Sequence, residues 1–288
     1  MMYQRCLFIT VGLLMMVGAI TTASANDLAI YSGPTNSGWI SIAAAKKNAD
    51  TIMNDSRIKK IFKDIKNFGD GEEVGYNSPL GKWVTTHTGN SKQDVLITAS
   101  GTAPSALYPF PNKEPDGSNI EKFLEDGNVL INVADWILYM SYEGGVRSPD
   151  NAAAGAANVF DIPGLTFANR GGPQKPTADG QKYIPSLKEF QSDRPWHLEQ
   201  FNGTDWQVTA FAKADDTTAD PAVAVNKVYG GVIAAMWQKA QPDWVGEDPR
   251  GIGVIEFIAN WLTEKGNLTA VDPQGKVATT WGKIKSRF

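Results

Sequence analysis

The feature that most constrains the fold is a series of short apolar runs separated by polar, helix-forming segments. The clearest series has an apolar run at 94–99, a Pro-rich loop, a short helix at 118–125 and a second apolar run at 128–133. Strands that are apolar throughout and alternate with helices are typical of a parallel sheet whose two faces are both covered. The sequence therefore predicts an α/β fold with a mostly parallel central sheet.

The same alternation continues on both sides of this stretch. Ser118 is followed three positions later by Glu121, which predicts a capping box at the start of the helix. Segment 170–181 is rich in Gly, Pro and Lys, and we expect an exposed loop there. The late strands are expected to add an antiparallel edge to the sheet. The further elements that we expect are strands at 27–31, 60–68, 165–168 and 205–212, a hairpin at 222–237, and helices at 40–53, 79–88, 151–160 and 251–262.

The two ends of the chain differ from the middle. Arg5 precedes an uncharged apolar run at 7–20, and Ala23-Ser24-Ala25 follows it. This pattern is typical of a Sec-type signal peptide at 1–25 that is cleaved after Ala25. The run is too short to span a bilayer, so we expect a secreted or periplasmic protein with no membrane anchor after cleavage. Residues 26–267 would then form one α/β domain, and 268–288 a C-terminal strand or tail.

Composition excludes several chemistries. Cys6 is the only cysteine and lies in the predicted signal peptide, so the mature chain has no thiolate ligand and no Cys nucleophile. Because the chain also has only two histidines, too few ligands are present for a typical zinc site, and we expect neither a metal site nor a cofactor. The net charge is −4 and the charges are interspersed, which is not the basic stripe of a nucleic-acid-binding protein. The oligomeric state is left open.

Four stretches carry a resemblance to a known family. They are DLAIYSG at 27–33, DVLITASG at 94–101, NVLINVADW at 128–136, and a late block that contains WQVTAFAKADD, GGVIAAMWQ and RGIGVIEFIANWL. In these places the chain resembles the class I glutamine amidotransferase-like superfamily, and within it the trehalose-utilisation family. The resemblance implies a flavodoxin-like three-layer sandwich.

The resemblance also bears on catalysis. In catalytic members of the superfamily, a strand-to-helix turn holds a nucleophilic Cys, and a His and a Glu follow later in the chain. Here the matching turn is Val133-Ala134-Asp135, while His197 and Glu199 supply the later pair. A base without a nucleophile within hydrogen-bond reach forms no triad. The resemblance therefore implies a fold whose amidotransferase chemistry has been lost.

A ligand site is expected at one rim of the sheet, because open α/β sheets bind ligands beyond the carboxyl ends of their strands. Asp135 is the most informative member of this rim, since a carboxylate at the end of a buried strand needs a partner. It could cap a helix or contact a ligand. The acidic turn at 69–73 is expected to be solvated rather than to bind a cation. The residues assigned to the rim are Ser32, Asn36, Asp70, Gly101, Ser105, Tyr108, Asp135 and Trp136.

Three functional hypotheses follow. The leading one is an exported, non-catalytic protein that binds a small polar or carbohydrate ligand at this rim. The alternative is an enzyme of sugar metabolism in which Asp135 and His197, with Glu199 nearby, act as acid and base. The third is an envelope protein-interaction module whose tail from Leu268 docks a partner.

Overall fold

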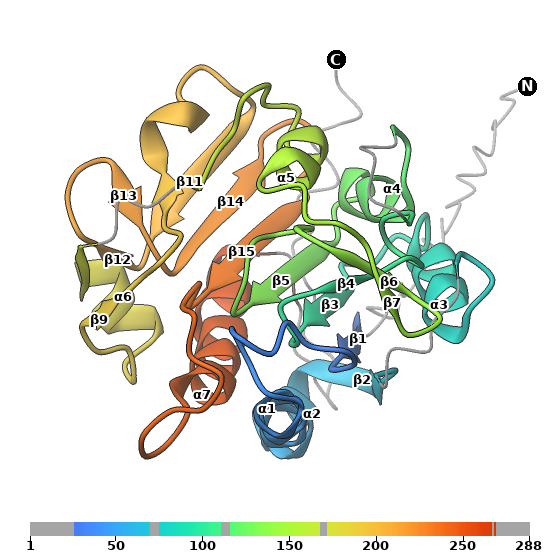
Figure 1. The fold of residues 1–288 in the computed structure, drawn as a ribbon, viewed down its shortest axis with the longest axis horizontal. Coiled ribbons are helices and arrows are strands. Elements are labelled where there is room, and N and C mark those ends of the chain that lie inside the picture. The colour runs from blue at the N-terminus through green and yellow to red at the C-terminus, as the bar shows by residue number, and fades with distance from the viewer. Residues whose placement is uncertain (1–25, 70–74, 111–115, 168–171, 267, 269–288) are drawn as a thin grey trace, which may run out of the picture.

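The computed structural model of the chain describes residues 26–69, 75–110, 116–167, 172–266 and Leu268 (Figure 1). The predicted signal peptide, Asp70 and the tail beyond Leu268 lie outside the described residues. Within the described part of the chain, no helix is both long and apolar enough to cross a membrane.

A seven-stranded sheet of order β11-β14-β15-β5-β3-β1-β2 forms the centre of the fold. Five neighbouring strands are parallel, and β14 and β11 add an antiparallel edge, as predicted. The strands β14 and β15 form the expected hairpin. The strands are β1 (Asn26–Tyr31), β2 (Phe62–Asn67), β3 (Val95–Thr98), β5 (Val129–Val133), β11 (Trp206–Ala210), β14 (Ala222–Asn226) and β15 (Val232–Met236).

Helices cover both faces of this sheet. Successive strand residues point to opposite faces, so Leu28 and Ile30 belong to one apolar core and Ala29 and Tyr31 to the other. Figure 1 shows α1, α2 and α7 together on one side. The first core includes α1 (Ile42–Asn54), α2 (Ile58–Ile61), α7 (Pro249–Glu256) and the π-helix Phe257–Leu262. The second core includes α3 (Pro79–His87), α4 (Asn119–Glu125) and α5 (Ala154–Val159).

Helix starts follow the capping rules. The Ser41 hydroxyl accepts a hydrogen bond from the backbone N–H of Ala44 at 3.0 Å, which begins α1. Ser118 and Glu121 form the predicted capping box of α4. The last long helix begins earlier than expected, because Asp248 caps it and a proline occupies its first position.

Two small sheets lie beside the main one and were not predicted. The prediction of a loop at 170–181 was wrong, because the described residues of that segment contain β8 (Pro173–Pro176) and part of α6 (Ala178–Tyr183). Thr177 caps α6 by accepting a hydrogen bond from the N–H of Gly180 at 3.0 Å. Residues 165–167 form no strand, and α2 replaces the start of the strand expected at 60–68. The remaining elements are β4 (Ala103–Pro104), β6 (Ser141–Glu143), β7 (Val146–Arg147), β8 (Pro173–Pro176), α6 (Ala178–Tyr183), β9 (Phe190–Gln191), β10 (Trp196–His197), the 3-10 helix Leu198–Phe201, β12 (Ala212–Lys213), β13 (Thr218–Ala219) and α8 (Thr263–Lys265).

Candidate functional site

The turn after β5 places Asp135 beneath the rim of the sheet. Ala134 has a φ of +79°, a left-handed conformation that is uncommon for a residue with a Cβ, and it turns the chain sharply. Asn132 fixes the turn by donating its side-chain N–H to the carbonyl oxygen of Asp135 at 2.5 Å. Gly101 approaches so closely that a Cβ built on it would lie 3.0 Å from the Asp135 Cβ. Asp135 is therefore held in a tightly packed position.

Three hydrogen bonds satisfy the carboxylate of Asp135. Asn36 donates to Oδ2 at 2.8 Å, and the Trp136 backbone N–H donates to Oδ1 at 2.7 Å. Arg194 donates from Nη1 to Oδ1 at 2.6 Å and completes an ion pair. Burial raises the pKa of Asp135 to about 6, although Arg194 and the hydrogen bonds act in the opposite direction. No helix begins at Trp136, so the carboxylate supports a turn rather than a helix start.

Aromatic rings surround the guanidinium of Arg194. Its Cζ lies 3.6 Å from the ring centroid of Trp136, 4.0 Å from that of Trp39 and 5.0 Å from that of Tyr139. These distances are within the range of cation–π attraction. The Arg194 side chain is 17% exposed, whereas that of Asp135 is 0% exposed. We name this group the Arg194 cluster, and its members are Asn36, Trp39, Asp135, Trp136, Tyr139 and Arg194.

A second set of buried hydrogen bonds fixes the segment that carries Arg194. The Ser192 hydroxyl donates to Oδ2 of Asp220 at 2.6 Å, and the Gln238 backbone N–H donates to the same oxygen at 2.8 Å. The Gln238 side chain in turn donates to the carbonyl oxygen of Arg194 at 2.7 Å. Asp220 Oδ1 has no hydrogen-bond partner among the described residues. Burial raises the pKa of Asp220 to about 7.

The structure brings some of the predicted rim residues together and separates others. Asn36, Gly101, Asp135 and Trp136 meet at the Arg194 cluster or pack directly against it. Of the others, Ser32, Ser105 and Tyr108 are buried and stabilise the surrounding fold. Ser32 donates to Asn67 Oδ1 at 3.0 Å, Ser105 accepts from the Gly75 backbone N–H at 2.9 Å, and Tyr108 lies fully inside the second core, while Asp70 lies outside the described residues.

The later His lies in a different sheet, and the later Glu lies in the short helix that follows it. His197 is buried in β10, and Glu199 is exposed in the short helix that follows. The side-chain hydrogen bonds of the Asp135 carboxylate go to Asn36 and Arg194, not to His197. Across the described ranges, no group of three or more His, Cys, Asp or Glu side chains is arranged to hold a metal ion.

Sequence reasoning missed Trp39, Tyr139 and Arg194. Trp39 ends the loop after the first strand, and Tyr139 follows the strand that contains Val133, so the rim rule could have included both. Arg194 follows β9 in the chain and joins the rim only through tertiary folding. No local pattern in its neighbourhood signals this role.

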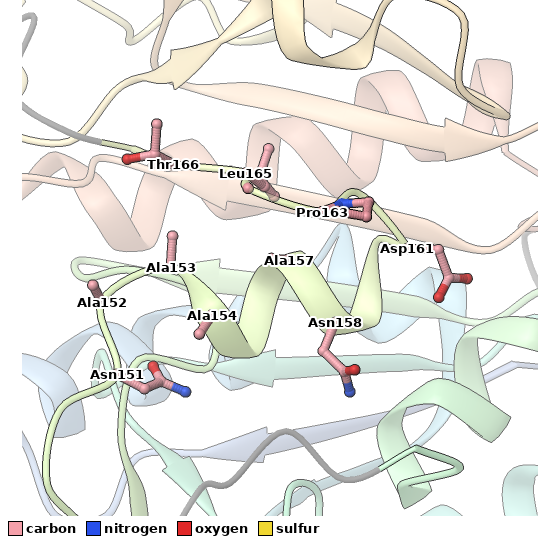
Figure 2. Close-up of a pocket in the computed structure, with 11 residues that line it drawn as sticks. Asn151, Ala152, Ala153, Ala154, Ala157, Asn158, Asp161, Pro163, Leu165 and Thr166 are labelled. Carbon is pink, nitrogen blue, oxygen red and sulfur yellow. The ribbon is translucent and has the colours of Figure 1, made fainter.

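Two open grooves lie elsewhere on the protein. One has a volume of about 560 Å³ and runs along α5 and the segment after it. Figure 2 shows Asn151 and Asn158 on one side of this helix, with Leu165 and Thr166 on the segment that returns alongside it. The other groove, of about 540 Å³, lies between β11, the start of α6 and the Leu198–Phe201 helix. Neither groove is lined by Asp135 or Arg194.

No protein-family model matches the chain, and no curated protein matches it. Function is therefore inferred from the geometry of the Arg194 cluster.

Proposed function

We propose that this chain is an exported, non-catalytic protein that binds a small polar or carbohydrate ligand at the Arg194 cluster. The observation that carries the proposal is the guanidinium of Arg194, which lies 3.6 Å from the Trp136 ring while the buried Asp135 holds it at 2.6 Å. Aromatic faces beside fixed hydrogen-bond donors suit the apolar face and the hydroxyl groups of a sugar. Ligand contact is assigned to the partly exposed members of the cluster, which are Asn36, Trp136, Tyr139 and Arg194.

We also propose that the fold is flavodoxin-like and belongs with the amidotransferase-like superfamily. The parallel strands have the order β2-β1-β3-β5-β15, which corresponds to the flavodoxin-like order 2-1-3-4-5. Ala134 has a φ of +79° and lies in the turn Val133-Ala134-Asp135, which the resemblance matches to the nucleophile turn of catalytic members. An alanine side chain has no nucleophilic atom, and this supports binding without catalysis.

One observation favours the alternative, an enzyme of sugar metabolism that uses Asp135 with His197. Burial raises the pKa of Asp135 to about 6, which suits a general acid or base near neutral pH. An enzyme would release a new sugar product from trehalose during incubation, whereas a binding protein would leave trehalose intact. Chromatography of the incubated mixture separates the two functions, and loss of any turnover in Asp135→Asn would assign the activity to this site.

The binding proposal is tested with trehalose and glucose as probes, by calorimetry and by the shifts of the Trp indole N–H signals in NMR spectra. Three matched amide truncations locate the site. Asn36→Ala removes an amide from the Arg194 cluster, Asn158→Ala one from the α5 groove, and Asn202→Ala one from the β11 groove.

We expect Asn36→Ala to weaken probe binding several-fold, as the loss of one hydrogen bond does, and the other two variants to bind as the wild type does. Weaker binding in Asn158→Ala or Asn202→Ala alone would place the ligand in a groove and overturn the assignment to the Arg194 cluster. A wild-type protein that binds no polar probe of the panel would contradict the proposed function.

A further inference from the structure

The guanidinium of Arg194 is limited in the contacts that it can still make. It lies over the rings of Trp136 and Trp39, so those contacts use the faces of the planar group. All five N–H donors of an arginine lie in the guanidinium plane. Hydrogen bonds from Arg194 to a ligand must therefore run along the in-plane edge, not from the stacked faces.

Part of that edge is unused. Nη1 donates to Asp135, and within the described part of the chain Nε and Nη2 of Arg194 make no hydrogen bond. The Arg194 side chain reaches solvent while the Asp135 carboxylate does not. A molecule that arrives at this rim therefore meets donors of the arginine, whereas the carboxylate behind it is buried and already accepts hydrogen bonds from Asn36, Trp136 and Arg194.

On this basis we infer that the ligand of the Arg194 cluster carries a carboxylate group, which the free in-plane donors of Arg194 bind. This inference rests on the proposed function and narrows its ligand to an acidic sugar or a similar polar carboxylate. A guanidinium edge matches the two oxygens of a carboxylate, and such charge-assisted pairs are stronger than neutral hydrogen bonds. The ring of Trp136, which is partly exposed, would contact the apolar face of the same molecule.

The test compares glucuronate with glucose, a pair that differs in one carboxylate, by calorimetry on the mature chain. Arg194→Lys keeps the positive charge but loses the planar donor edge, and Arg147→Lys makes the same change at an exposed arginine in β7. We expect the wild type to bind glucuronate about tenfold more tightly than glucose, the factor that one added charge-assisted hydrogen bond supplies. Arg194→Lys should weaken glucuronate binding more than glucose binding, so that most of this preference is lost, and Arg147→Lys should match the wild type.

Equal affinity of the wild type for glucuronate and glucose would overturn the inference and leave the proposed function standing. Loss of the preference in Arg147→Lys as well would mean that the preference does not depend on the donor edge of Arg194, and it would also overturn the inference. If the wild type binds neither sugar, both the inference and the proposed function are contradicted. Unchanged melting temperatures of the two variants establish that any loss reflects the site rather than unfolding.

Discussion

Arg194 and Asp135 form an ion pair of 2.6 Å in which one partner is fully buried and the other reaches solvent. Burial makes the charge of Asp135 costly, and Arg194 and Asn36 offset part of that cost. The pair is therefore asymmetric, because Asp135 holds Arg194 in position while Arg194 offers its remaining edge to the surface. The two residues are 59 positions apart, so only the completed fold forms this pair.

Asp135 should make the stability of the protein depend on pH. Its folded-state pKa of about 6 lies above the ordinary value of 3.8, so the folded protein keeps this proton to higher pH than the unfolded chain does. The contribution to the free energy of unfolding is therefore full below about pH 4 and falls as pH rises to about 6. For one proton this slope approaches about 1.4 kcal/mol per pH unit. Asp135→Asn cannot ionise, so its free energy of unfolding, measured in urea from pH 4 to 7, should lack the part of the pH dependence that comes from Asp135.

A direct measurement of the same carboxyl group accompanies the unfolding series. The carboxyl carbon of Asp135 should titrate near pH 6 in NMR spectra of the folded wild type. A midpoint below the ordinary value of 3.8, or an unchanged slope in Asp135→Asn, would contradict the assignment.

Gly101 should tolerate substitution less well than a glycine of the same backbone conformation elsewhere. It has a φ of +72°, and an added Cβ would lie 3.0 Å from the Asp135 Cβ. Gly203 has a φ of +76° and no neighbour within 4 Å of an added Cβ. Gly203→Ala should cost about 1–2 kcal/mol for the left-handed conformation alone. Gly101→Ala should lower the free energy of unfolding by about 1 kcal/mol more than Gly203→Ala does, because Asp135 must move to make room for the added Cβ.

Urea unfolding of the two glycine variants measures this difference, and the indole signal of Trp136 reports the displacement of Asp135. Equal costs for Gly101→Ala and Gly203→Ala would mean that Asp135 is not tightly packed. A larger cost for Gly203→Ala would contradict the packing argument directly.

The main sheet could be predicted from the sequence because its strands are apolar on both faces. Leu96 and Ile97 point to opposite cores, so each strand reads as a continuous apolar run. The helix α6 could not be predicted, because Gly180 within it packs against the carbonyl oxygen of Phe211, a contact between distant segments. The candidate site divides in the same way. Asp135 could be predicted because it follows the end of a buried strand. Arg194 could not, because it meets Asp135 only in the folded protein and no local sequence pattern indicates that contact.

The capping box of α4 should contribute measurably to stability. The Ser118 hydroxyl accepts a hydrogen bond from the Glu121 backbone N–H, and the Glu121 side chain accepts one from the Ser118 backbone N–H at 2.8 Å. Ser118→Ala should lower the free energy of unfolding by about 1 kcal/mol, since it removes one side of the box. Ser56→Ala, at an exposed serine, is the matched control and should change stability little. Equal effects of the two substitutions in urea unfolding would refute a stabilising role for the box.

Asp220 should produce a second dependence of stability on pH, which extends further toward neutral pH. Its pKa of about 7 lies above the ordinary value of 3.8, mainly because the group is buried, so its stabilising contribution falls as pH rises from about 4 to about 7. Asp220→Asn cannot ionise, and its remaining oxygen can still accept from the Ser192 hydroxyl and the Gln238 N–H. The variant should therefore gain stability relative to the wild type between pH 5 and pH 8 in urea unfolding.

Ser192→Ala should act in the opposite direction at pH 8. It removes the hydroxyl that donates to the ionised Asp220 carboxylate at 2.6 Å, and a lost hydrogen bond of this kind costs about 1–3 kcal/mol. The free energies of unfolding of the two variants therefore diverge as pH rises. That of Asp220→Asn should lie above the wild-type value and that of Ser192→Ala below it. If Asp220→Asn instead loses stability relative to the wild type as pH rises, the carboxylate is stabilised in its ionised form and burial does not dominate its pKa.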